Sequence, residues 1–400
     1  MKICDLTQFY SPVSGGVKRY ITEKRRHIER HTQDEHYLII PGHETRHTQE
    51  GRLHTYTIQA PQLNPTSRYR LLLNTHRVRD FLDDVRPDVI EAGDPYHVAW
   101  TALRSGRELH IPVFGFYHSH FPEAYLRTVL KYGGRWVRDA VLEFAQRYIT
   151  SLYSRFHATL VPSDLLRDLL LRWGVTNATT VHLGVDTESF RPGERDDALR
   201  AELGLPRDAL VLLYVGRLAP EKNIVTLLRA FELVREQSKR DVRLVLVGDG
   251  PLRRKLPAVR RATGALTWKS YLQGNEDLAR YYRAADLFVH PGVHETFGLV
   301  ALEAQACGIP VAGIHGSYMD ANVFAGGDYW ARENTPAALA RTILAMSEAD
   351  LPAMGRAASA IVRERYAWPV VLEVLWRHYR QAHELASHPV YYGKPWEVPS

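Results

Sequence analysis

The first half of the chain alternates short apolar runs with amphipathic stretches. The apolar runs predict strands at residues 2–6, 35–40, 87–93 and 112–118, and the helical periodicity of apolar positions predicts helices at 17–29 and 68–85. The predicted strands are apolar throughout rather than alternating with polar residues, which is typical of strands buried on both faces. The pattern therefore predicts a parallel sheet covered by helices on both sides.

The same pattern begins again after about residue 190. Strands are expected at 209–216, 242–251, 286–292 and 309–314, and helices at 223–236, 251–263 and 276–285. This is a second doubly wound α/β pattern, and 400 residues are too many for one ordinary core. The charged stretch 185–204 is typical of a domain boundary. We expect domains at 1–190 and 191–370, and a C-terminal helix with a tail, 371–400, that crosses back to the first domain.

The composition indicates a soluble globular protein, with 45% hydrophobic and 24% charged residues. No apolar run approaches the roughly 20 residues that span a bilayer, and the first residues lack the apolar core of a secretory signal. Cys4 and Cys307 form neither a disulfide framework nor a pattern of metal ligands. A cytoplasmic location is therefore expected.

The net charge of +6 and the pI of about 9.2 favour attraction to polyanions. Nucleic acid, anionic lipid and phosphorylated ligands are the candidates, but the chain has no zinc finger and no aromatic RNA-binding signature. We therefore expect no nucleic-acid partner. An arginine-rich surface that is merely solvated is the alternative.

The segment from His294 to Gly313 carries two carboxylates, Glu295 and Glu303, eight residues apart. A helix is expected to begin near Phe297 or Gly298, and its free N–H groups suit a phosphate. Glycine at that point would allow a ligand to approach the backbone closely. The two carboxylates could then accept sugar hydroxyls at the two ends of one elongated ligand. Alternatively, both are ordinary surface glutamates.

Three other loops follow predicted strands and carry candidate residues. Arg217 and Lys222 lie between a strand and a helix, where two cations can clamp a diphosphate, and Asn223 is a candidate N-cap. Gly15 and Gly16 form a turn ahead of a helix that is compatible with phosphate, although such pairs are common. His118 and His120 lie at a strand end, where they are either active-site or structural residues; a metal site would need a third ligand.

Taken together and in this order, the segments resemble the retaining glycosyltransferases of family 4, also called glycosyl transferases group 1. The resemblance extends from about Lys2 to Tyr379 through segments such as SGGVKRY, VGRLAPEKN and HETFGLVALEAQACG. It implies the GT-B fold, with two Rossmann-like doubly wound domains facing a cleft. It also implies retaining transfer of a hexose, with mannose and glucose as candidates, from a nucleoside-diphosphate sugar to a lipid-linked, glycan or small-molecule acceptor.

The resemblance also implies roles for individual residues. Arg217 and Lys222 would hold the diphosphate, Glu303 the ribose hydroxyls, and Glu295 the donor sugar. The N–H groups of Phe297, Gly298 and Leu299 would assist Glu295, Gly15 and Gly16 would lie near the phosphates, and His118 would orient sugar and acceptor. The loop with Gly248 and residues 271–275 would flank the base. No Asp-x-Asp motif is found, so neither a metal nor another cofactor is expected.

Two segments depart from the usual family pattern. Thr296 stands where many members have glycine, which leaves the sugar preference open. The segment HSHFPEAY, which begins at His118, is most similar to mannosyltransferases and points to GDP-mannose. A non-catalytic module that binds a sugar nucleotide, or another GT-B activity such as a sugar-nucleotide epimerase, is the alternative function.

Basic residues in the predicted acceptor domain suggest a membrane surface. Arg127, Lys131, Arg135 and Arg138 would share a helix face beside Tyr132 and Trp136, although Gly133 and Gly134 interrupt the helical pattern. A second cluster comprises Arg68, Arg70, Arg77 and Arg79. We hypothesise peripheral attachment to the inner face of an anionic membrane, with a lipid-linked acceptor. The alternative is a soluble surface rich in arginine.

Overall fold

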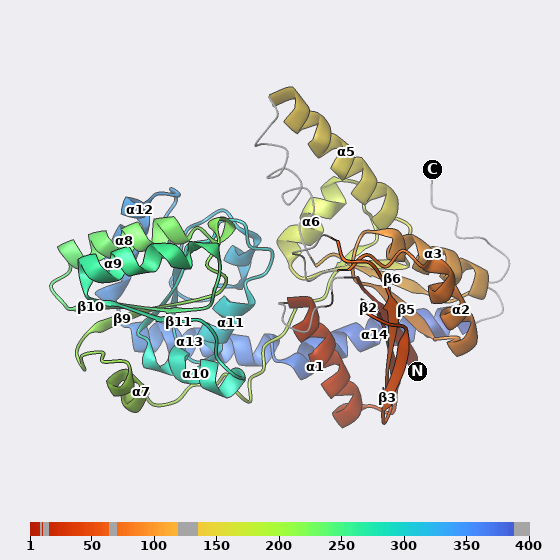
Figure 1. Cartoon of the computed structure of the whole chain (residues 1–400), viewed down its shortest axis with the longest axis horizontal. Helices are drawn as coiled ribbons and strands as arrows, with labels where there is room; N and C mark the ends of the chain where they lie inside the picture. The colour runs from red at the N-terminus through yellow and green to blue at the C-terminus, as the bar shows by residue number, and fades with distance from the viewer. Residues whose placement is uncertain (9, 11–15, 64–69, 119–134, 388–400) are drawn as a thin grey trace. The chain divides into compact units, whose positions relative to one another are not determined.

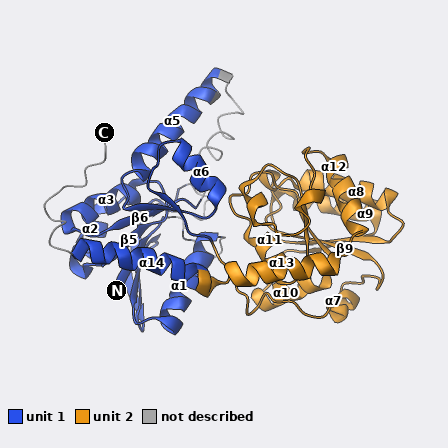
Figure 2. Cartoon of the chain, turned by 180° about the vertical axis from the view of Figure 1, so that it is seen from behind, with its two compact units in different colours: residues 1–182, 371–400 blue, residues 183–370 orange. Residues whose placement is uncertain are grey.

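The computed structural model describes residues 1–8, 10, 16–63, 70–118 and 135–387. The chain forms two compact units, coloured separately in Figure 2. The first comprises Met1–His182 together with Val371–Ser400, and the second comprises Leu183–Val370.

The first unit contains an eight-stranded sheet in the order β3-β4-β2-β1-β5-β6-β7-β8. All neighbouring pairs are parallel except β3 and β4. The strands are β1 (Lys2–Leu6), β2 (Glu35–Gly42), β3 (Arg46–Glu50), β4 (Leu53–Gln59), β5 (Val89–Ala92), β6 (Val113–Phe116), β7 (Ala158–Val161) and β8 (Ala178–Thr180). The predicted parallel sheet is confirmed, but the antiparallel pair was not predicted because every residue of β3 is exposed and carries no apolar pattern.

Helices cover this sheet (Figure 1). They are α1 (Gly16–His31), α2 (Thr75–Val85), α3 (His97–Leu109), α5 (Arg135–Tyr153), α6 (Asp164–Arg172) and most of α14 (Trp368–Ser387). The predicted helix at 68–85 was too long, since α2 begins only at Thr75. Asn74 is the N-cap at which the helix begins, and its side chain accepts a hydrogen bond from the backbone N–H of Arg77 at 3.2 Å.

The second unit contains a five-stranded parallel sheet in the order β11-β10-β9-β12-β13. The strands are β9 (Leu210–Val215), β10 (Val242–Val247), β11 (Leu266–Lys269), β12 (Leu287–His290) and β13 (Val311–Gly313). This is the doubly wound order in which the chain changes direction between β9 and β12. The predicted fold class is therefore confirmed for this unit as well.

Seven α-helices and four 3-10 turns belong to the described part of the second unit. The α-helices are α7 (Asp197–Glu202), α8 (Ile224–Gln237), α9 (Leu256–Thr263), α10 (Asn275–Ala284), α11 (Leu299–Ala306), α12 (Pro336–Ser347) and α13 (Leu351–Arg365), and the turns are η1 (Pro220–Lys222), η2 (Pro251–Lys255), η3 (Tyr318–Asn322) and η4 (Gly327–Tyr329). The single helix predicted at 251–263 is divided into η2 and α9. Pro257 lies in the first turn of α9, where its missing N–H is tolerated.

The segment 183–190 belongs to the second unit, although the predicted boundary assigned it to the first domain. Its backbone pairs with the residues that precede α14: the N–H of Val185 donates to the carbonyl of Tyr366 at 2.8 Å, and the N–H of Trp368 donates to the carbonyl of Val185 at 3.2 Å. Phe190 is buried against the ring of Tyr282. Backbone pairing and apolar burial therefore fix this segment in the second unit, despite its charged sequence.

A buried network of charges joins α14 to the sheet of the first unit. The ammonium of Lys24 on α1 lies 2.8 Å from the carboxylate of Asp5 on β1 and 3.2 Å from that of Glu91 on β5. It also donates to the hydroxyl of Tyr379 at 3.0 Å, and this hydroxyl donates to Glu91. Burial opposes the ionisation of Asp5, but Lys24 and then His36 outweigh it, so the pKa of Asp5 is well below its usual value.

Replacing Lys24 with methionine should destabilise the first unit strongly. Two carboxylates would remain buried without their cation, and breaking a buried ion pair in this way costs about 3–5 kcal/mol. Urea unfolding monitored by circular dichroism at pH 7 would measure the change. The triple variant Asp5→Asn, Lys24→Met, Glu91→Gln is the matched control and should recover part of the loss. A single variant as stable as the wild type would contradict the prediction.

Candidate functional site

The second unit brings Lys222 and Glu295 into direct contact. Lys222 ends η1 in the loop after β9, and Glu295 lies in the loop between β12 and α11. The ammonium of Lys222 donates a hydrogen bond to Oε1 of Glu295. Because β9 and β12 are neighbouring parallel strands, their carboxyl ends deliver the two side chains to one edge of the sheet. The cation and the carboxylate predicted from separate motifs therefore belong to one site.

A third member of this site, His290, was not singled out from the sequence. It is the last residue of β12 and is buried, and its Nε2 lies 3.7 Å from Oε1 of Glu295. Gly292 packs against its ring, since a Cβ at this glycine would lie 2.9 Å from Cε1 of His290. The available signal was its position at the carboxyl end of a predicted strand.

The local charges keep Glu295 ionised. Burial alone would raise the pKa of this carboxyl, but His290 and Lys222 together outweigh burial and lower it below its usual value. The pKa of His290 is lowered because burial disfavours the imidazolium, even though Glu295 acts in the opposite direction. At neutral pH the site therefore presents an anionic Glu295 beside a neutral imidazole.

Arg217 lies in the same loop as Lys222 but makes a different contact. Its guanidinium pairs with Glu221, and its side chain is 65% exposed. The hydroxyl of Tyr214 donates to the backbone carbonyl of Arg217 at 3.1 Å, which holds the start of the loop. The charge of Arg217 also helps to lower the pKa of Glu295, so the two groups belong to one electrostatic environment.

Asn223 occupies the predicted N-cap position of α8 but makes no capping hydrogen bond. Its backbone is left-handed, with φ of 57°. Its side-chain amide instead donates to the carbonyl of Pro291 at 2.8 Å and to the side chain of Asn334 at 2.7 Å. The residue therefore ties the loop of Lys222 to the loop that leads to Glu295.

Gly248 is required by packing between two backbone segments. Its φ is 134°, and a Cβ at this position would lie 2.0 Å from the carbonyl oxygen of Gly216. Its own carbonyl accepts a hydrogen bond from the indole of Trp268 at 2.8 Å. The loops after β9 and β10 thus touch through their main chains. The role of Gly248 and of residues 271–275 beside a nucleotide base stays a prediction.

The start of α11 is close to its predicted position, and packing also requires glycine at position 298; the expected role of Gly298 toward a ligand stays a prediction. Leu299 is the first helical residue, and Gly298 precedes it with φ of 80°. A Cβ at Gly298 would lie 2.2 Å from Cγ of Met319, so the side chain of Met319 leaves no room for a Cβ at this position. Phe297 is buried, and its carbonyl accepts a hydrogen bond from Asn322 at 2.9 Å. The first N–H groups of a helix nevertheless have no intrahelical partner.

Glu303 lies inside the second unit, with 1% of its surface exposed. Its Oε2 accepts a hydrogen bond from the hydroxyl of Tyr282 on α10 at 3.0 Å. The alternative that both glutamates of the segment are surface residues is therefore wrong. Burying a carboxylate costs free energy unless hydrogen bonds or a cation compensate it, so the hydrogen bond from Tyr282 helps to hold Glu303 inside the unit.

His118 follows β6 in the first unit and is held by aromatic rings. It stacks on Phe116, with centroids 3.9 Å apart and planes 3° from parallel, and it lies edge-on to Tyr20 at 5.3 Å. Burial, assisted by the charge of Lys24, lowers the pKa of His118 to about 3. The ring is therefore neutral at physiological pH. Gly16 is the exposed first residue of α1, whereas Gly15 and His120 lie outside the described residues.

The predicted basic clusters are described only in part. Arg127, Lys131 and Tyr132 lie outside the described residues, as do the side chains of Arg135 and Arg138 and all of Gly133, Gly134 and Arg68. In the second cluster, Arg70 donates to the carbonyl of Ala60 at 2.5 Å, and Arg79 pairs with Glu108 at 3.2 Å. Of the described members, Arg77 is exposed on α2. Two described members of the second cluster are thus engaged within the protein, and its role at a membrane surface stays a prediction.

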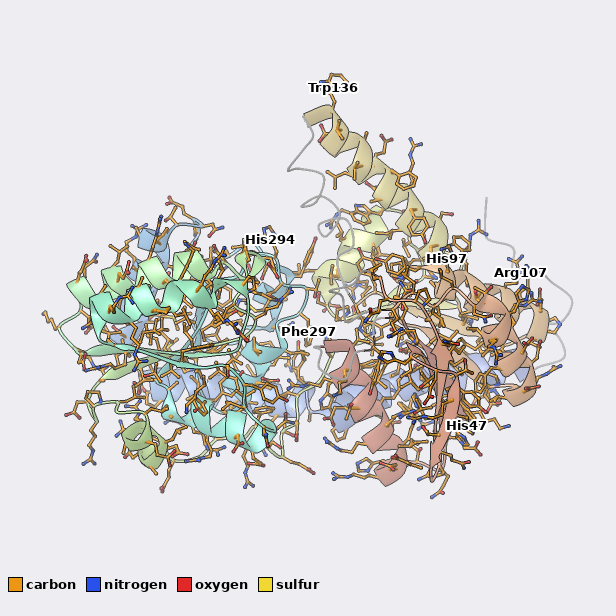
Figure 3. The ribbon with its side chains drawn as sticks, viewed as in Figure 1. His47, His97, Arg107, Trp136, His294 and Phe297 are labelled. Carbon is orange, nitrogen blue, oxygen red and sulfur yellow. The ribbon has the colours of Figure 1, made fainter. Side chains whose placement is uncertain are left out.

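The first half of α5 exposes apolar side chains. Trp136, labelled in Figure 3, lies near the start of the helix. Its side chain is 90% exposed, and that of Phe144 is 73% exposed. Among the helices that the structure describes, none is both long enough and apolar enough to cross a bilayer. Within the same part of the chain, no three His, Cys, Asp or Glu side chains gather as candidate metal ligands.

Two family descriptions match successive parts of the chain. Residues 14–189 match "Glycosyltransferase Family 4", and residues 195–360 match "Glycosyl transferases group 1". A GDP-mannose-dependent alpha-(1-6)-phosphatidylinositol dimannoside mannosyltransferase of Mycobacterium tuberculosis is 30% identical over 313 residues, which cover 78% of each chain. A D-inositol 3-phosphate glycosyltransferase of Saccharomonospora viridis is 46% identical over 142 residues, 33% of each chain.

Solved structures with low sequence identity share the fold. The sucrose-phosphate synthase of Thermosynechococcus elongatus superimposes with a TM-score of 0.76 at 20% identity, covering 96% of this chain and 99% of the other. Anabaena HepE, solved in complex with UDP and glucose, gives a TM-score of 0.71 at 18% identity, covering 95% and 100%. The fold expected from the resemblance is thus confirmed over nearly the whole chain.

Replacing Lys222 with alanine should raise the pKa of Glu295, because the carboxylate loses the cation in contact with it. Carbon-13 NMR of the glutamate carboxyl during a pH titration would measure the shift. Since the folded pKa is lowered, Glu295 contributes stability above its unfolded pKa and loses it as the pH falls through the folded value. In the variant the loss should be smaller and should be complete at a higher pH, because the folded pKa lies closer to the unfolded one. Arg217→Ala is the matched control and should have a smaller effect, and an unchanged pKa in Lys222→Ala would refute the ion pair.

Proposed function

The chain belongs to glycosyltransferase family 4, and on that premise we propose that it is a retaining, metal-independent mannosyltransferase that uses GDP-mannose. Transfer of a sugar from a nucleotide-sugar donor follows from the family. The choice of mannose is supported by the names of several relatives, among them GDP-mannose-dependent mannosyltransferases of Mycobacterium and Corynebacterium. The observation that carries the assignment of the site is the contact between Lys222 and Glu295.

In this proposal the diphosphate of the donor takes the place of Glu295 as the partner of Lys222. The diphosphate attracts Lys222 away from Glu295 because it carries more negative charge than one carboxylate. Arg217, which is exposed in the same loop, supplies the second cation. Glu295 is then free to accept hydrogen bonds from hydroxyl groups of the sugar. One ion pair would thus become two contacts with the donor.

The same cations would promote the reaction. When the bond between sugar and phosphate breaks, the leaving nucleoside diphosphate gains negative charge, and fixed cations aimed at it lower the barrier. Lys222, Arg217 and the N-terminus of α11 at Phe297, Gly298 and Leu299 supply this positive potential. They can do so without a metal ion. Retention is proposed to arise from attack on the same face of the sugar, with the leaving phosphate assisting.

The remaining roles follow the same assignment. Glu303 would accept hydrogen bonds from the ribose, with its carboxylate oriented by Tyr282. His118 would act as a neutral hydrogen-bonding group toward sugar and acceptor, since a pKa of about 3 leaves it uncharged at physiological pH. Gly16 would allow close approach to phosphates. The acceptor is proposed to be an inositol-containing or lipid-linked glycan, as in the names of two relatives.

A panel of nucleotide sugars tests the function directly. Release of nucleoside diphosphate should be fastest with GDP-mannose and an inositol glycolipid acceptor. Lys222→Ala should reduce kcat by about 10²-fold or more, because a charge contact in the transition state is lost. Lys239→Ala, an exposed lysine two residues after the end of α8, is the matched control and should keep wild-type kinetics. Binding of GDP-mannose without any turnover would favour the non-catalytic alternative.

Peripheral attachment to an anionic membrane is the second part of the proposal. The exposed Trp136 and Phe144 on α5 provide the apolar contact, and the basic sequence around them provides attraction to anionic lipid. Replacing both with serine should weaken binding to vesicles that contain anionic phospholipid. Leu165→Ser with Leu171→Ser, each leucine 43% exposed on α6, is the matched control. Equal binding of wild-type protein to anionic and neutral vesicles at low salt would refute the electrostatic part.

A further inference from the structure

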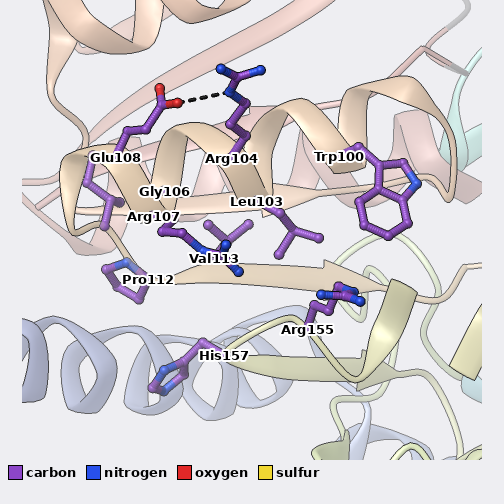
Figure 4. A pocket seen from close by; sticks show the side chains of 11 residues that line it. Trp100, Leu103, Arg104, Gly106, Arg107, Glu108, Pro112, Val113, Arg155 and His157 are labelled. Carbon is purple, nitrogen blue, oxygen red and sulfur yellow. Dashed lines mark hydrogen bonds and ion pairs between the residues drawn. The ribbon is translucent and has the colours of Figure 1, made fainter. Parts of the chain in front are cut away.

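A pocket of about 430 Å³ lies in the first unit, on the opposite edge of the sheet from His118. It is bounded by α3 from Trp100 onward, the beginning of β6 and the residues that lead into β7 (Figure 4). β6 begins at Val113 in the pocket wall, and His118 follows five residues later. The strand from Val113 to Phe116 alone spans roughly 10 Å, at about 3.3 Å per residue. The pocket is therefore separate from the region of His118.

The side chains around this pocket leave an excess of positive charge. The residues that line the pocket include three arginines, Arg104, Arg107 and Arg155, but a single carboxylate, Glu108. Glu108 is engaged with Arg104 at 2.9 Å and, outside the pocket, with Arg79 at 3.2 Å. Within the described part of the chain, no carboxylate lies within 4.0 Å of the guanidinium of Arg107 or Arg155. Two arginines therefore remain for an external anion.

These two arginines come from different segments, and one of them is already held in place. The Nε of Arg155 donates to the carbonyl of Ser151 at 3.0 Å, and its guanidinium lies 5.6 Å from the centre of the Trp100 ring. The Nε–H is used in this way, while the terminal nitrogens stay available for an anion. A side chain fixed before binding loses less conformational entropy when the ligand arrives.

The floor of the pocket is formed by a close approach of helix and strand. A Cβ at Gly106 would lie 2.2 Å from Cγ2 of Val113 and 2.8 Å from the carbonyl oxygen of Ile111. Glycine is therefore needed for α3 to reach this strand. The carbonyl of Gly106 also accepts a hydrogen bond from the N–H of Ile111 at 2.8 Å, so this helix-end carbonyl is occupied.

The arginines could have a purely structural purpose, because basic residues in the last turn favour the negative end of a helix. That explanation covers Arg107, which lies in the last turn of α3. It does not account for Arg155, which precedes β7 and reaches the same pocket. The helix end acts against a bound anion, but its effect is weaker than that of charge-assisted hydrogen bonds between arginine and phosphate.

We propose that this pocket is a second binding site, specific for a ligand that carries a phosphate group. Arg107 and Arg155 bind the phosphate, His157 lines the same space, and Trp100 and Leu103 contact the less polar part of the ligand. The recognised chemistry is a phosphomonoester or phosphodiester. Either a soluble sugar phosphate or the headgroup of a phospholipid supplies it.

The test uses the full-length protein with its donor site saturated by GDP, so that only a second site remains to be measured. Calorimetric titration with inositol 1-phosphate should show binding that weakens with added salt. Arg107→Ala with Arg155→Ala should lower the affinity by about tenfold, since two arginine–phosphate contacts are lost. Arg46→Ala with Arg172→Ala, two exposed arginines of the same unit, is the matched control and should leave the affinity unchanged.

A second readout does not depend on the stability of the variants. In the wild-type protein, inositol 1-phosphate should shift the NMR signal of the Arg155 Nε–H. The other arm of the test uses vesicles that contain phosphatidylinositol. If only the vesicles bind, and their binding requires Arg107 and Arg155, the ligand is a phospholipid headgroup. If inositol 1-phosphate binds, the ligand is a free, soluble compound. No binding in either arm, or an equal loss in the control pair, overturns the proposal.

Discussion

The contact between Lys222 and Glu295 depends on the order of the strands in the second unit. Seventy-three residues separate the two side chains along the chain, yet they follow neighbouring strands. The pairing of Leu212 with Leu287 fixes these strands side by side, and both point their carboxyl ends to the same edge. The chain changes direction between them, which is where doubly wound sheets bind their ligands. The order of the strands therefore determines where the site lies, and the side chains determine only what it can bind.

Burial lowers the pKa of a histidine in each of the two units. His118 and His290 each lie at or just beyond the carboxyl end of a strand, and the pKa of each is lowered mainly by burial. The carboxylates beside them do not become neutral, because cations are in contact: Lys24 beside Asp5 in the first unit and Lys222 beside Glu295 in the second. Both units therefore combine neutral imidazoles with ionised carboxylates.

Much of the fold could be predicted from the sequence, because the central strands are buried on both faces. The strand 2–6 was predicted with its observed limits, and 209–216 differs from β9 by one residue at each end. The hairpin strand β3 could not be predicted in this way, since its exposed residues RHTQE carry no pattern. The helix at 251–263 was also misread, because periodicity does not distinguish a 3-10 turn from the first turn of a helix.

The candidate site was predictable to the extent that its residues follow strands. Lys222 and Glu295 were expected to bind one ligand, and the structure brings them together. The reason for Gly298 was not predictable, because Met319, which fills the space beside it, belongs to a distant turn. His290 was not singled out because an apolar run does not reveal the direction of its last side chain. Contacts of this kind depend on tertiary packing rather than on a local pattern.

In the proposed mechanism His290 acquires its importance once the donor has bound. The donor takes Lys222 from Glu295, and the carboxylate then loses the cation that donates to it while it remains partly buried. The sugar hydroxyls replace the lost hydrogen bonds but bring no positive charge. His290, with Nε2 3.7 Å from the same oxygen, is the group whose protonation would respond to that loss. An uncompensated carboxylate raises the proton affinity of a neighbouring imidazole, so the site can keep Glu295 ionised whether Lys222 contacts it or contacts the diphosphate.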